Sequence, residues 1–209
     1  MIYRKFLKRI ADFIIALLSL VLFSPIFILI CILIKLDSKG PVFFRQRRIG
    51  KDKKEFMILK FRSMNSDAPK DEPTYMLKNP DEYITRVGKV LRKTSLDELP
   101  QLINIIIGQM SIVGPRPVIS NEYDLITKRD EYGIYDVKPG LTGWAQINGR
   151  DEVLTDLKVR YDREYVEKLC FTFDLKCIVK TILLVLKADG ILEGARADGI
   201  TKERQKLKG

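Results

Sequence analysis

The sequence predicts an α-rich α+β protein whose N-terminal helix associates with a membrane. Three observations lead to this fold class: an uncharged apolar segment at residues 13–34, a strand–turn–strand pattern at residues 41–62, and helical periods further along the chain. The chain has 209 residues, of which 46% are hydrophobic and 31% charged. This composition suffices for one folded domain with a buried core and a water-exposed surface.

The apolar segment 13–34 contains 22 residues and no charge. As a straight helix it would extend about 33 Å, enough to cross a hydrocarbon core of about 30 Å. The segment is longer than the apolar core of a signal peptide, and no small-residue cleavage site follows it. A transmembrane helix is therefore the first expectation.

Two features favour a re-entrant helix hairpin instead. Ser24-Pro25 lies near the middle of the segment, where the proline kinks the helix and the serine hydroxyl can satisfy a freed carbonyl. Basic residues flank both ends of the segment, whereas a spanning helix usually has one clearly basic, cytoplasmic side. A kinked hairpin with arms of about 16 and 14 Å would enter and leave by the same face. The residues alone leave both topologies open.

The basic excess is concentrated at this end of the chain. Residues 1–54 hold twelve Lys/Arg and three Asp/Glu, a balance of +9, out of a net charge of +10. Basic residues beside an apolar segment bind anionic membrane lipids, at about 1 kcal/mol each. A nucleic-acid binder would spread basic and aromatic residues over its folded domain, so no nucleic-acid partner is expected.

Two residue types limit the chemistry. The sequence has no histidine, which excludes histidine-based acid–base catalysis and histidine-containing zinc sites. Cys31, Cys170 and Cys177 lack a CxxC spacing and are predicted to be reduced packing residues.

Residues 41–62 predict a β-hairpin with a turn at Gly50-Lys51-Asp52-Lys53. The second strand ends with Lys60 and Arg62 in alternation with an aromatic residue. These cations either belong to a site or form a solvated strand face. Residues 63–82 are polar, contain three prolines, and predict a loop with a short helical piece.

A carboxylate pair, Asp97 and Glu98, follows the helix predicted for residues 83–94. The pattern Ser95-x-x-Glu98 is a capping box, which predicts the start of a second helix that continues to Gly108. The capping box by itself gives Glu98 a structural role. The alternative is phosphoryl chemistry, because an Asp can attack phosphorus, a Glu can help hold Mg²⁺, and a helix N-terminus attracts phosphate.

Two further segments carry candidate binding residues. Arg116 lies between prolines in Gly114-Pro115-Arg116-Pro117, which favours a fixed guanidinium able to clamp phosphate, with an ordinary turn as the alternative. Residues 138–150 hold three glycines and the only tryptophan, together with polar residues that predict a binding loop, namely Gln146, Asn148 and Arg150.

Two helices are predicted near the C-terminus. Residues 155–169 form a charged helix whose neighbouring charges are expected to pair on its surface; they are Arg160, Asp162, Arg163 and Glu164. Residues 171–187 form a helix with one apolar face, which suits either a core helix or an amphipathic helix in the membrane interface. The expected division is a membrane helix over 1–36, a cytosolic catalytic domain over 37–189, and a flexible basic tail over 190–209.

Four ordered blocks resemble the bacterial sugar transferase family, the polyprenyl-phosphate glycosyl-1-phosphate transferases. The blocks are KFRSM at 60–64, LRKTSLDELPQLINIIIGQMSIVGPRP at 91–117, KPGLTGWAQINGR at 138–150 and DLKVRYDREYVEKL at 156–169. The resemblance covers nearly the whole chain, which looks like a small member without extra N-terminal membrane helices.

The resemblance implies a reaction and a set of site residues. A sugar-1-phosphate would pass from a UDP-sugar to undecaprenyl phosphate with release of UMP, through a covalent phosphosugar-aspartyl intermediate. Asp97 would be the nucleophile, Glu98 would bind Mg²⁺ together with Asp97, and Arg116 would bind phosphate. Further phosphate-binding residues would be Lys60, Arg62 and Arg92.

The resemblance also bears on topology and pathway. The Ser24-Pro25 break matches that of the family, which implies a re-entrant, monotopic helix at the cytoplasmic face of the bacterial plasma membrane. The expected pathway step is the first membrane step of glycoconjugate or exopolysaccharide synthesis. Two alternatives stay open, a non-enzymatic membrane scaffold and a transferase that works by single displacement. The identity of the sugar and the formation of a homodimer are also open.

Overall fold

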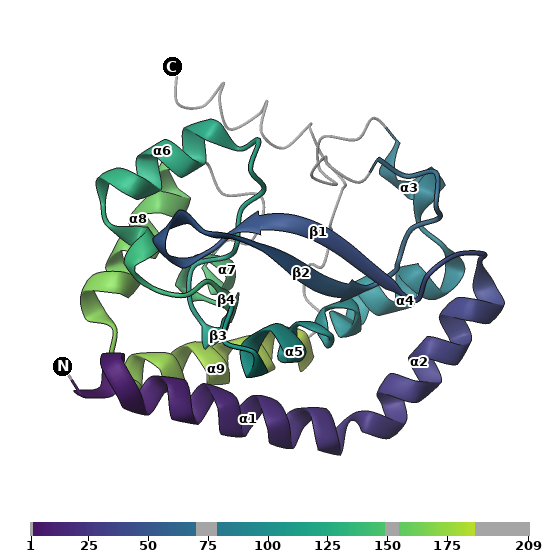
Figure 1. Ribbon diagram of the computed structural model, residues 1–209, viewed down its shortest axis with the longest axis horizontal. Coiled ribbons are helices and arrows are strands. Elements are labelled where there is room, and N and C mark those ends of the chain that lie inside the picture. The colour runs from purple at the N-terminus through teal and green to yellow at the C-terminus, as the bar shows by residue number, and fades with distance from the viewer. Residues whose placement is uncertain (1, 70–78, 149–154, 187–209) are drawn as a thin grey trace.

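The computed structural model describes residues 2–69, 79–148 and 155–186, and it shows a helix-rich molecule with two small sheets (Figure 1). The predicted tail and Arg150 lie outside the described residues. The first half of the chain contains a π-helical turn η1 (Tyr3–Leu7), α1 (Lys8–Leu22), α2 (Ser24–Asp37), β1 (Phe43–Ile49), η2 (Lys51–Lys53), β2 (Glu55–Phe61), α3 (Pro80–Tyr83), α4 (Arg86–Thr94), η4 (Leu96–Glu98) and α5 (Gln101–Ile106). The second half contains β3 (Ser111–Val113), α6 (Tyr123–Glu131), η5 (Ile134–Asp136), β4 (Gly140–Thr142), α7 (Trp144–Ile147), α8 (Thr155–Lys168) and α9 (Phe171–Leu186).

The apolar N-terminal segment is a bent pair of helices, as the Ser-Pro pattern predicts. Residues Tyr3–Leu22 and Ser24–Asp37 meet at an angle of 63°. Pro25 occupies the first turn of α2, where its missing N–H costs little. The Ser24 hydroxyl donates to the Val21 carbonyl at 2.8 Å, which confirms the expected role of the serine. In the described part of the chain no single helix is long and apolar enough to cross a membrane. The two helices of the bent pair reach this length and apolar composition only together.

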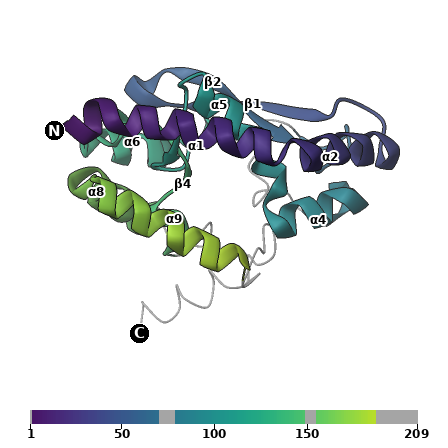
Figure 2. The same ribbon diagram turned by 90° about the horizontal axis from the view of Figure 1, so that it is seen from below.

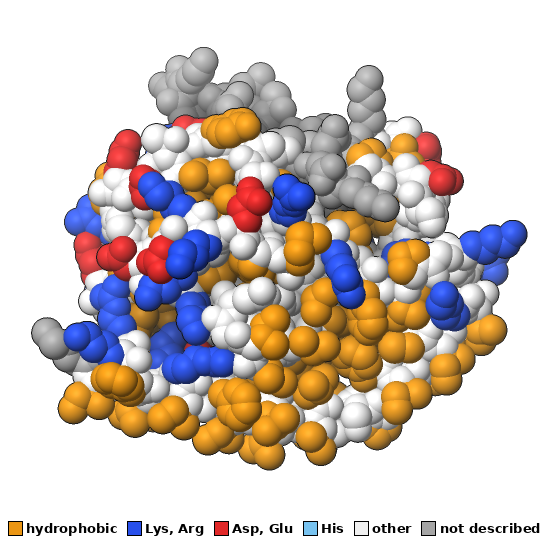
Figure 3. Space-filling model, viewed as in Figure 1, with side chains coloured by type: hydrophobic (Ala, Val, Ile, Leu, Met, Phe, Trp, Pro, Cys, Tyr) orange, Lys and Arg blue, Asp and Glu red, His pale blue; other side chains and the backbone are white. Residues whose placement is uncertain are grey.

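Apolar side chains remain exposed on three helices. On α1 and α2 the exposed fraction of several leucines and isoleucines exceeds one half, reaching 72% at Leu22 and 79% at Leu36. Figure 3 shows these side chains gathered over α1 and α2 along the lower edge of the molecule. Helix α9, which lies on the same side of the molecule (Figure 2), exposes Leu175, Val179 and Ile182. Exposed apolar surface of this extent is typical of an interaction surface rather than of a water-facing one.

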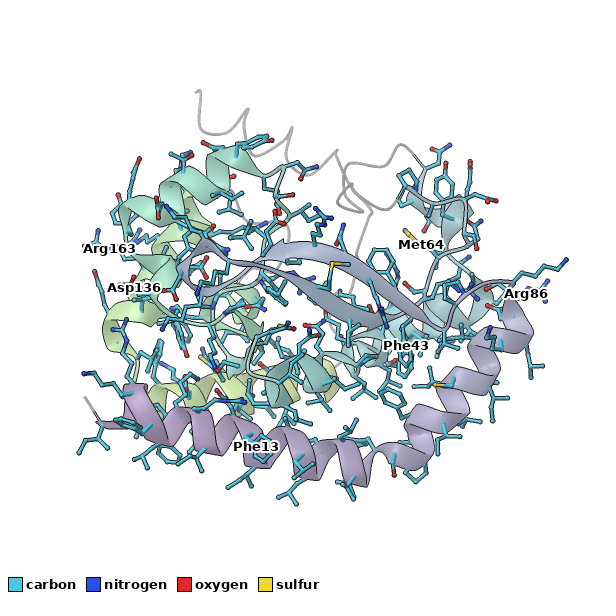
Figure 4. All side chains as sticks on the ribbon, viewed as in Figure 1. Phe13, Phe43, Met64, Arg86, Asp136 and Arg163 are labelled. Atoms are coloured by element: carbon cyan, nitrogen blue, oxygen red, sulfur yellow. The ribbon has the colours of Figure 1, made fainter. Side chains whose placement is uncertain are left out.

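The β-hairpin is confirmed. Strands β1 and β2 pair antiparallel with Phe44 opposite Lys60, and the turn between them places Asp52 and Lys53 at positive φ. The hairpin packs against α2 through aromatic rings. Phe61 lies 4.6 Å from Phe27 and 5.7 Å from Phe43 between ring centroids, and Figure 4 labels Phe43 where the hairpin approaches α2. The bent helix pair is therefore packed directly against the folded domain.

The loop conformation predicted for residues 138–150 is wrong for the residues that the structure describes, while their binding role stays a prediction. Gly140–Thr142 form strand β4, which pairs parallel with β3. Trp144 begins α7 and is buried in the main core beside Phe173 and Tyr165. The glycines that suggested a loop instead allow two backbones to touch: a Cβ at Gly140 or Gly143 would overlap backbone atoms of Gly114. The composition of this segment thus reflects close packing.

Candidate active site

Four charged side chains from three separate segments meet at one place. Lys60 is the penultimate residue of β2, Asp97 and Glu98 occupy the turn η4, and Arg116 follows β3. The Lys60 Nζ lies 2.7 Å from Glu98 Oε1 and 3.8 Å from Asp97 Oδ2, and Arg116 Nη1 lies 3.3 Å from Glu98 Oε1. Sequence reasoning predicted all four as site residues, and the structure brings them together.

Asn104 holds the strand of Lys60 against the helix that follows the carboxylates. Its side-chain oxygen accepts from the Leu59 N–H at 3.0 Å, and its amide donates to the Met57 carbonyl at 2.8 Å. Asn104 is 1% exposed, so these hydrogen bonds are shielded from water. Lys60 is therefore fixed relative to α5 and to the carboxylate turn before it. A single Asn inside the apolar run 102–107 is the sequence signal that could have revealed this role.

The capping box predicted at Ser95 is wrong. Ser95 has a left-handed backbone, with φ +56°, and ends α4. Among the described residues its side chain makes no capping hydrogen bond to the η4 turn. Asp97 and Glu98 stand in this short 3₁₀ turn ahead of α5, which begins at Gln101. The structural explanation for Glu98 therefore fails, and its side chain contacts the two cations of the cluster.

The turn of Arg116 is fixed on both sides by backbone contacts. The Gly114 N–H donates to the Thr142 carbonyl at 2.8 Å, and the Gly140 N–H donates to the Pro115 carbonyl at 2.9 Å. Arg129 Nη1 donates to the Arg116 carbonyl at 2.8 Å. With its backbone held in this way, Arg116 keeps a side chain that is 32% exposed. It can therefore reach both Glu98 and a ligand in solvent.

The cluster keeps Glu98 ionised. Burial opposes the charge, but Lys60 and Arg116 outweigh burial through their charges and hydrogen bonds and lower the pKa of Glu98 to about 2. The Asp97 side chain is 7% exposed and the Glu98 side chain 16%. Two carboxylates and two cations balance in formal charge, so a bound group with no net charge of its own would leave the site neutral. Within the described residues no group of three or more Cys, Asp and Glu could hold a metal.

Two other predicted cations have different partners. Arg62 is 6% exposed and donates to the carbonyls of Lys39 and Ser38 at 2.6 and 2.7 Å, which ties the hairpin to the end of α2. Arg92 donates from Nε to the Ser63 hydroxyl at 2.8 Å. Both residues lie on segments next to the cluster, and their contact with phosphate stays a prediction.

The polar residues of segment 138–150 contact their own surroundings. Gln146 donates to the Leu141 carbonyl at 3.4 Å, and Asn148 donates to the Trp144 carbonyl at 2.7 Å. Both interactions brace α7, while Arg150 lies outside the described residues. The role of these three residues toward a substrate stays a prediction.

Sequence reasoning missed a buried ion pair behind the cluster. Asp162, predicted to pair on the surface of its own helix, is 1% exposed and accepts from Arg129 Nε and Nη2 at 3.0 and 2.5 Å. Its neighbours Arg163 and Glu164 do pair locally, with Glu167 and Lys168. Because Arg129 also holds the Arg116 carbonyl, this pair supports the site from beneath. Spacing on one helix could not reveal it, since the partner comes from α6.

Comparison with known proteins agrees with this geometry. The profile of the bacterial sugar transferase family matches residues 3–188. The exopolysaccharide production protein ExoY of Sinorhizobium fredii is 41% identical over 197 residues, covering 88% of this chain and 87% of that protein. The uncharacterized sugar transferase EpsL of Bacillus subtilis is 39% identical over 199 residues and 95% of both chains.

The name of a larger relative specifies a reaction. The UDP-glucose:undecaprenyl-phosphate glucose-1-phosphate transferase of Escherichia coli is 44% identical over 185 residues, which are 85% of this chain but 40% of that protein. The family profile, which matches residues 3–188, includes the segments that carry all four residues of the cluster. The chain belongs to the bacterial sugar transferase family.

Proposed function

We propose that this protein transfers a sugar-1-phosphate from a UDP-sugar to undecaprenyl phosphate and releases UMP. The observation that carries the proposal is the convergence of Lys60 and Arg116 on the carboxylate pair Asp97 and Glu98. Relatives named as UDP-sugar transferases acting on undecaprenyl phosphate support this substrate class.

The transfer proceeds in two displacements at one phosphorus atom. An Asp97 carboxylate oxygen attacks the sugar-bearing phosphorus, the bond from that phosphorus to the bridging oxygen breaks, and UMP leaves with the electron pair. A phosphate oxygen of undecaprenyl phosphate then attacks the same phosphorus and displaces the Asp97 carboxylate. The products are the polyprenyl diphosphate sugar and the free enzyme. Arg116 and Lys60 hold the phosphate oxygens while charge builds on the leaving group.

Asp97 and Glu98 are also the residues that would hold Mg²⁺. Magnesium is commonly bound by one or two carboxylates together with substrate phosphates, and the low pKa of Glu98 keeps that ligand ionised. The charge count fits as well, because Mg²⁺ and the two phosphate charges of a UDP-sugar add no net charge to a balanced cluster. When bound, the ion would polarise the diphosphate and offset the charge of the leaving UMP.

The test is UMP release by purified protein with undecaprenyl phosphate and a panel of UDP-sugars. We expect release with at least one sugar, and loss of that release on chelation of Mg²⁺. With a donor labelled in the sugar phosphate and no acceptor, the label should appear on the protein at Asp97. Release of UMP without a trapped label would favour single displacement, and no release with any sugar would favour a scaffold.

We further propose that α1 and α2 form a re-entrant hairpin at the cytoplasmic face of the plasma membrane. The 63° bend and the exposed apolar surface of both helices support this topology. An Ile2→Cys change, in a background with the three native cysteines replaced by serine, tests it. In intact spheroplasts an impermeant thiol reagent should not label residue 2, and strong labelling would show a spanning helix.

A further inference from the structure

Helix α1 has a polar stripe on the side that faces the folded domain. Lys8 and Asp12 are 9% and 5% exposed, and they stand four residues apart in line with the fully buried Ala16. The other side of the helix is apolar and open, with Leu18 and Leu22 63% and 72% exposed. Burying charge on an apolar helix is costly unless the charge is paired. The partners of Asp12 in this stripe and of the neighbouring Arg9 therefore indicate what the helix does besides anchoring the protein.

Arg9 binds the C-terminal end of α5. Its Nη1 donates to the Ile105 carbonyl at 2.5 Å and its Nη2 to the Ile106 carbonyl at 2.7 Å. These are carbonyls of the last turn, which lack partners inside the helix and carry its negative dipole end. Helix α5 starts three residues after Glu98. Arg9 thus holds the far end of the short helix that follows the carboxylate pair.

Asp12 binds strand β3, which leads to Arg116. Its Oδ1 accepts from the Ile112 N–H at 3.0 Å, within the buried core. On the next residue, the Val113 carbonyl lies 2.9 Å from the Tyr165 hydroxyl. The strand ends at Val113, and the turn of Arg116 follows directly. Asp12 therefore fixes the strand from which the Arg116 turn begins.

We propose that Arg9 and Asp12 are positioning residues, through which α1 sets the separation between the carboxylate pair and Arg116. The inference rests on the proposed function for its catalytic consequence. One helix grips both segments, and the contact that depends on them is the 3.3 Å approach of Arg116 to Glu98. A displacement of about 1 Å in such a site can cost about 100-fold in rate. The apolar helix would then be part of the active-site scaffold as well as an anchor.

The decisive variants are Arg9→Gln and Asp12→Ala, with matched controls in the preceding turn η1. Arg4 and Lys5 are exposed and lie within a few residues of Arg9, so Arg4→Gln and Lys5→Gln remove the same charge without touching α5. Asp12→Asn keeps an oxygen that can accept from the Ile112 N–H. We expect kcat to fall about 10- to 100-fold in Arg9→Gln and Asp12→Ala, and to stay within about 3-fold of wild type in both controls and in Asp12→Asn.

Hydrogen–deuterium exchange gives a readout that does not depend on the reaction. Peptides over residues 111–117 should exchange faster in Asp12→Ala than in wild type, while Arg4→Gln and Asp12→Asn leave them unchanged. Equal exchange in Asp12→Ala and wild type would overturn the proposal whatever the activity. An equal loss of kcat in Arg4→Gln and Arg9→Gln would also overturn it, because basic charge at the lipid surface would then explain the effect. If wild-type protein releases no UMP, the proposed function fails and exchange alone decides the positioning role.

Discussion

Glu98 and Asp162 are both carboxylates enclosed by the fold, and the protein shifts their pKa values in opposite directions. At Asp162 burial outweighs the attraction of Arg129 and, to a smaller extent, of Lys158, and raises the pKa. At Glu98 burial is outweighed by two cations, and the pKa falls to about 2. The Arg129–Asp162 pair is sealed, with side chains 4% and 1% exposed, whereas Arg116 beside Glu98 is 32% exposed.

The difference separates a structural ion pair from a site prepared for a ligand. A sealed one-to-one pair has satisfied its charges and has no room for another group. In the Glu98 cluster two cations contact one carboxylate beside a second, Asp97, and the cation Arg116 reaches solvent. Substitutions in the cluster should therefore act mainly on the reaction, whereas loss of the Arg129–Asp162 pair should act mainly on the stability of the fold.

The largest effect is expected for Asp97→Asn. Asparagine keeps the shape but loses the nucleophilic charge, so transfer should fall by several orders of magnitude while the unfolding temperature stays near that of wild type. UMP release and thermal unfolding measured on the same lipid-reconstituted preparation check this. Near-normal UMP release would show that Asp97 is not the nucleophile. The Glu98 cluster would then no longer be distinguished from the structural Arg129–Asp162 pair.

Arg129→Met should act on stability instead. It leaves Asp162 buried and unpaired, which costs about 3–5 kcal/mol. A double change of Arg129→Met and Asp162→Leu should recover much of this loss, because no uncompensated charge remains. The matched control is Arg163→Met, whose exposed pair with Glu167 is expected to be worth less than about 1 kcal/mol. Equal denaturation midpoints for Arg129→Met and Arg163→Met would contradict the structural role of the Arg129–Asp162 pair.

Arg116→Lys tests the geometry of the cation rather than its charge. Lysine cannot offer two parallel N–H donors to a phosphate. A loss of about 10- to 100-fold in kcat/KM is expected, since hydrogen bonds to charged groups contribute roughly 1.5–3 kcal/mol each. Arg47→Lys, at an exposed position of β1, is the control. Unchanged kinetics in Arg116→Lys would leave Arg116 as a turn residue only.

The smallest effect concerns acid stability. Because the folded pKa of Glu98 lies below the ordinary value of 4.5, its ionisation stabilises the protein above that pH, and this stabilisation is lost as the pH falls toward 2. Lys60→Met removes one of the two positive charges that lower the pKa of Glu98. The pH at the midpoint of acid unfolding should therefore rise by up to about 1 unit. Circular dichroism between pH 5 and 2 measures it. Lys53→Met, in an exposed pair with Asp130, should leave the midpoint in place.

Local sequence patterns predicted the elements that depend on local physics. The hairpin followed from alternation around a four-residue turn, and the helix break followed from Ser24-Pro25, because proline chemistry acts within one turn. Phosphoryl chemistry at Asp97, Glu98 and Arg116 was suggested by the residue types, whereas the place of Lys60 beside them was expected only through resemblance to a family. Periodicity alone contains no information about contacts between residues 18 or 38 positions apart.

The failures have a common physical cause. The capping box at Ser95 was predicted from a four-residue motif and the loop at 138–150 from composition, yet pairing with β3 and burial in the core decided the conformation of residues 140–144. Lys8 and Arg9 were interpreted as the basic flank of an apolar segment and Asp12 was not singled out, although the partners of all three lie about 100 or more residues away. A four-residue spacing of Lys8, Asp12 and Ala16 was the available sign that one face of the helix packs against protein.

The contact between Gly114 and the pair Gly140 and Gly143 has a consequence for how this site can evolve or be redesigned. Backbone pressed on backbone has no side-chain rotamers to readjust, so the crossing cannot absorb an added methyl group as an ordinary core does by repacking. Residues elsewhere in the fold can vary while the position of Arg116 stays constant. Libraries that seek new donor specificity should therefore keep these three glycines fixed and place diversity elsewhere.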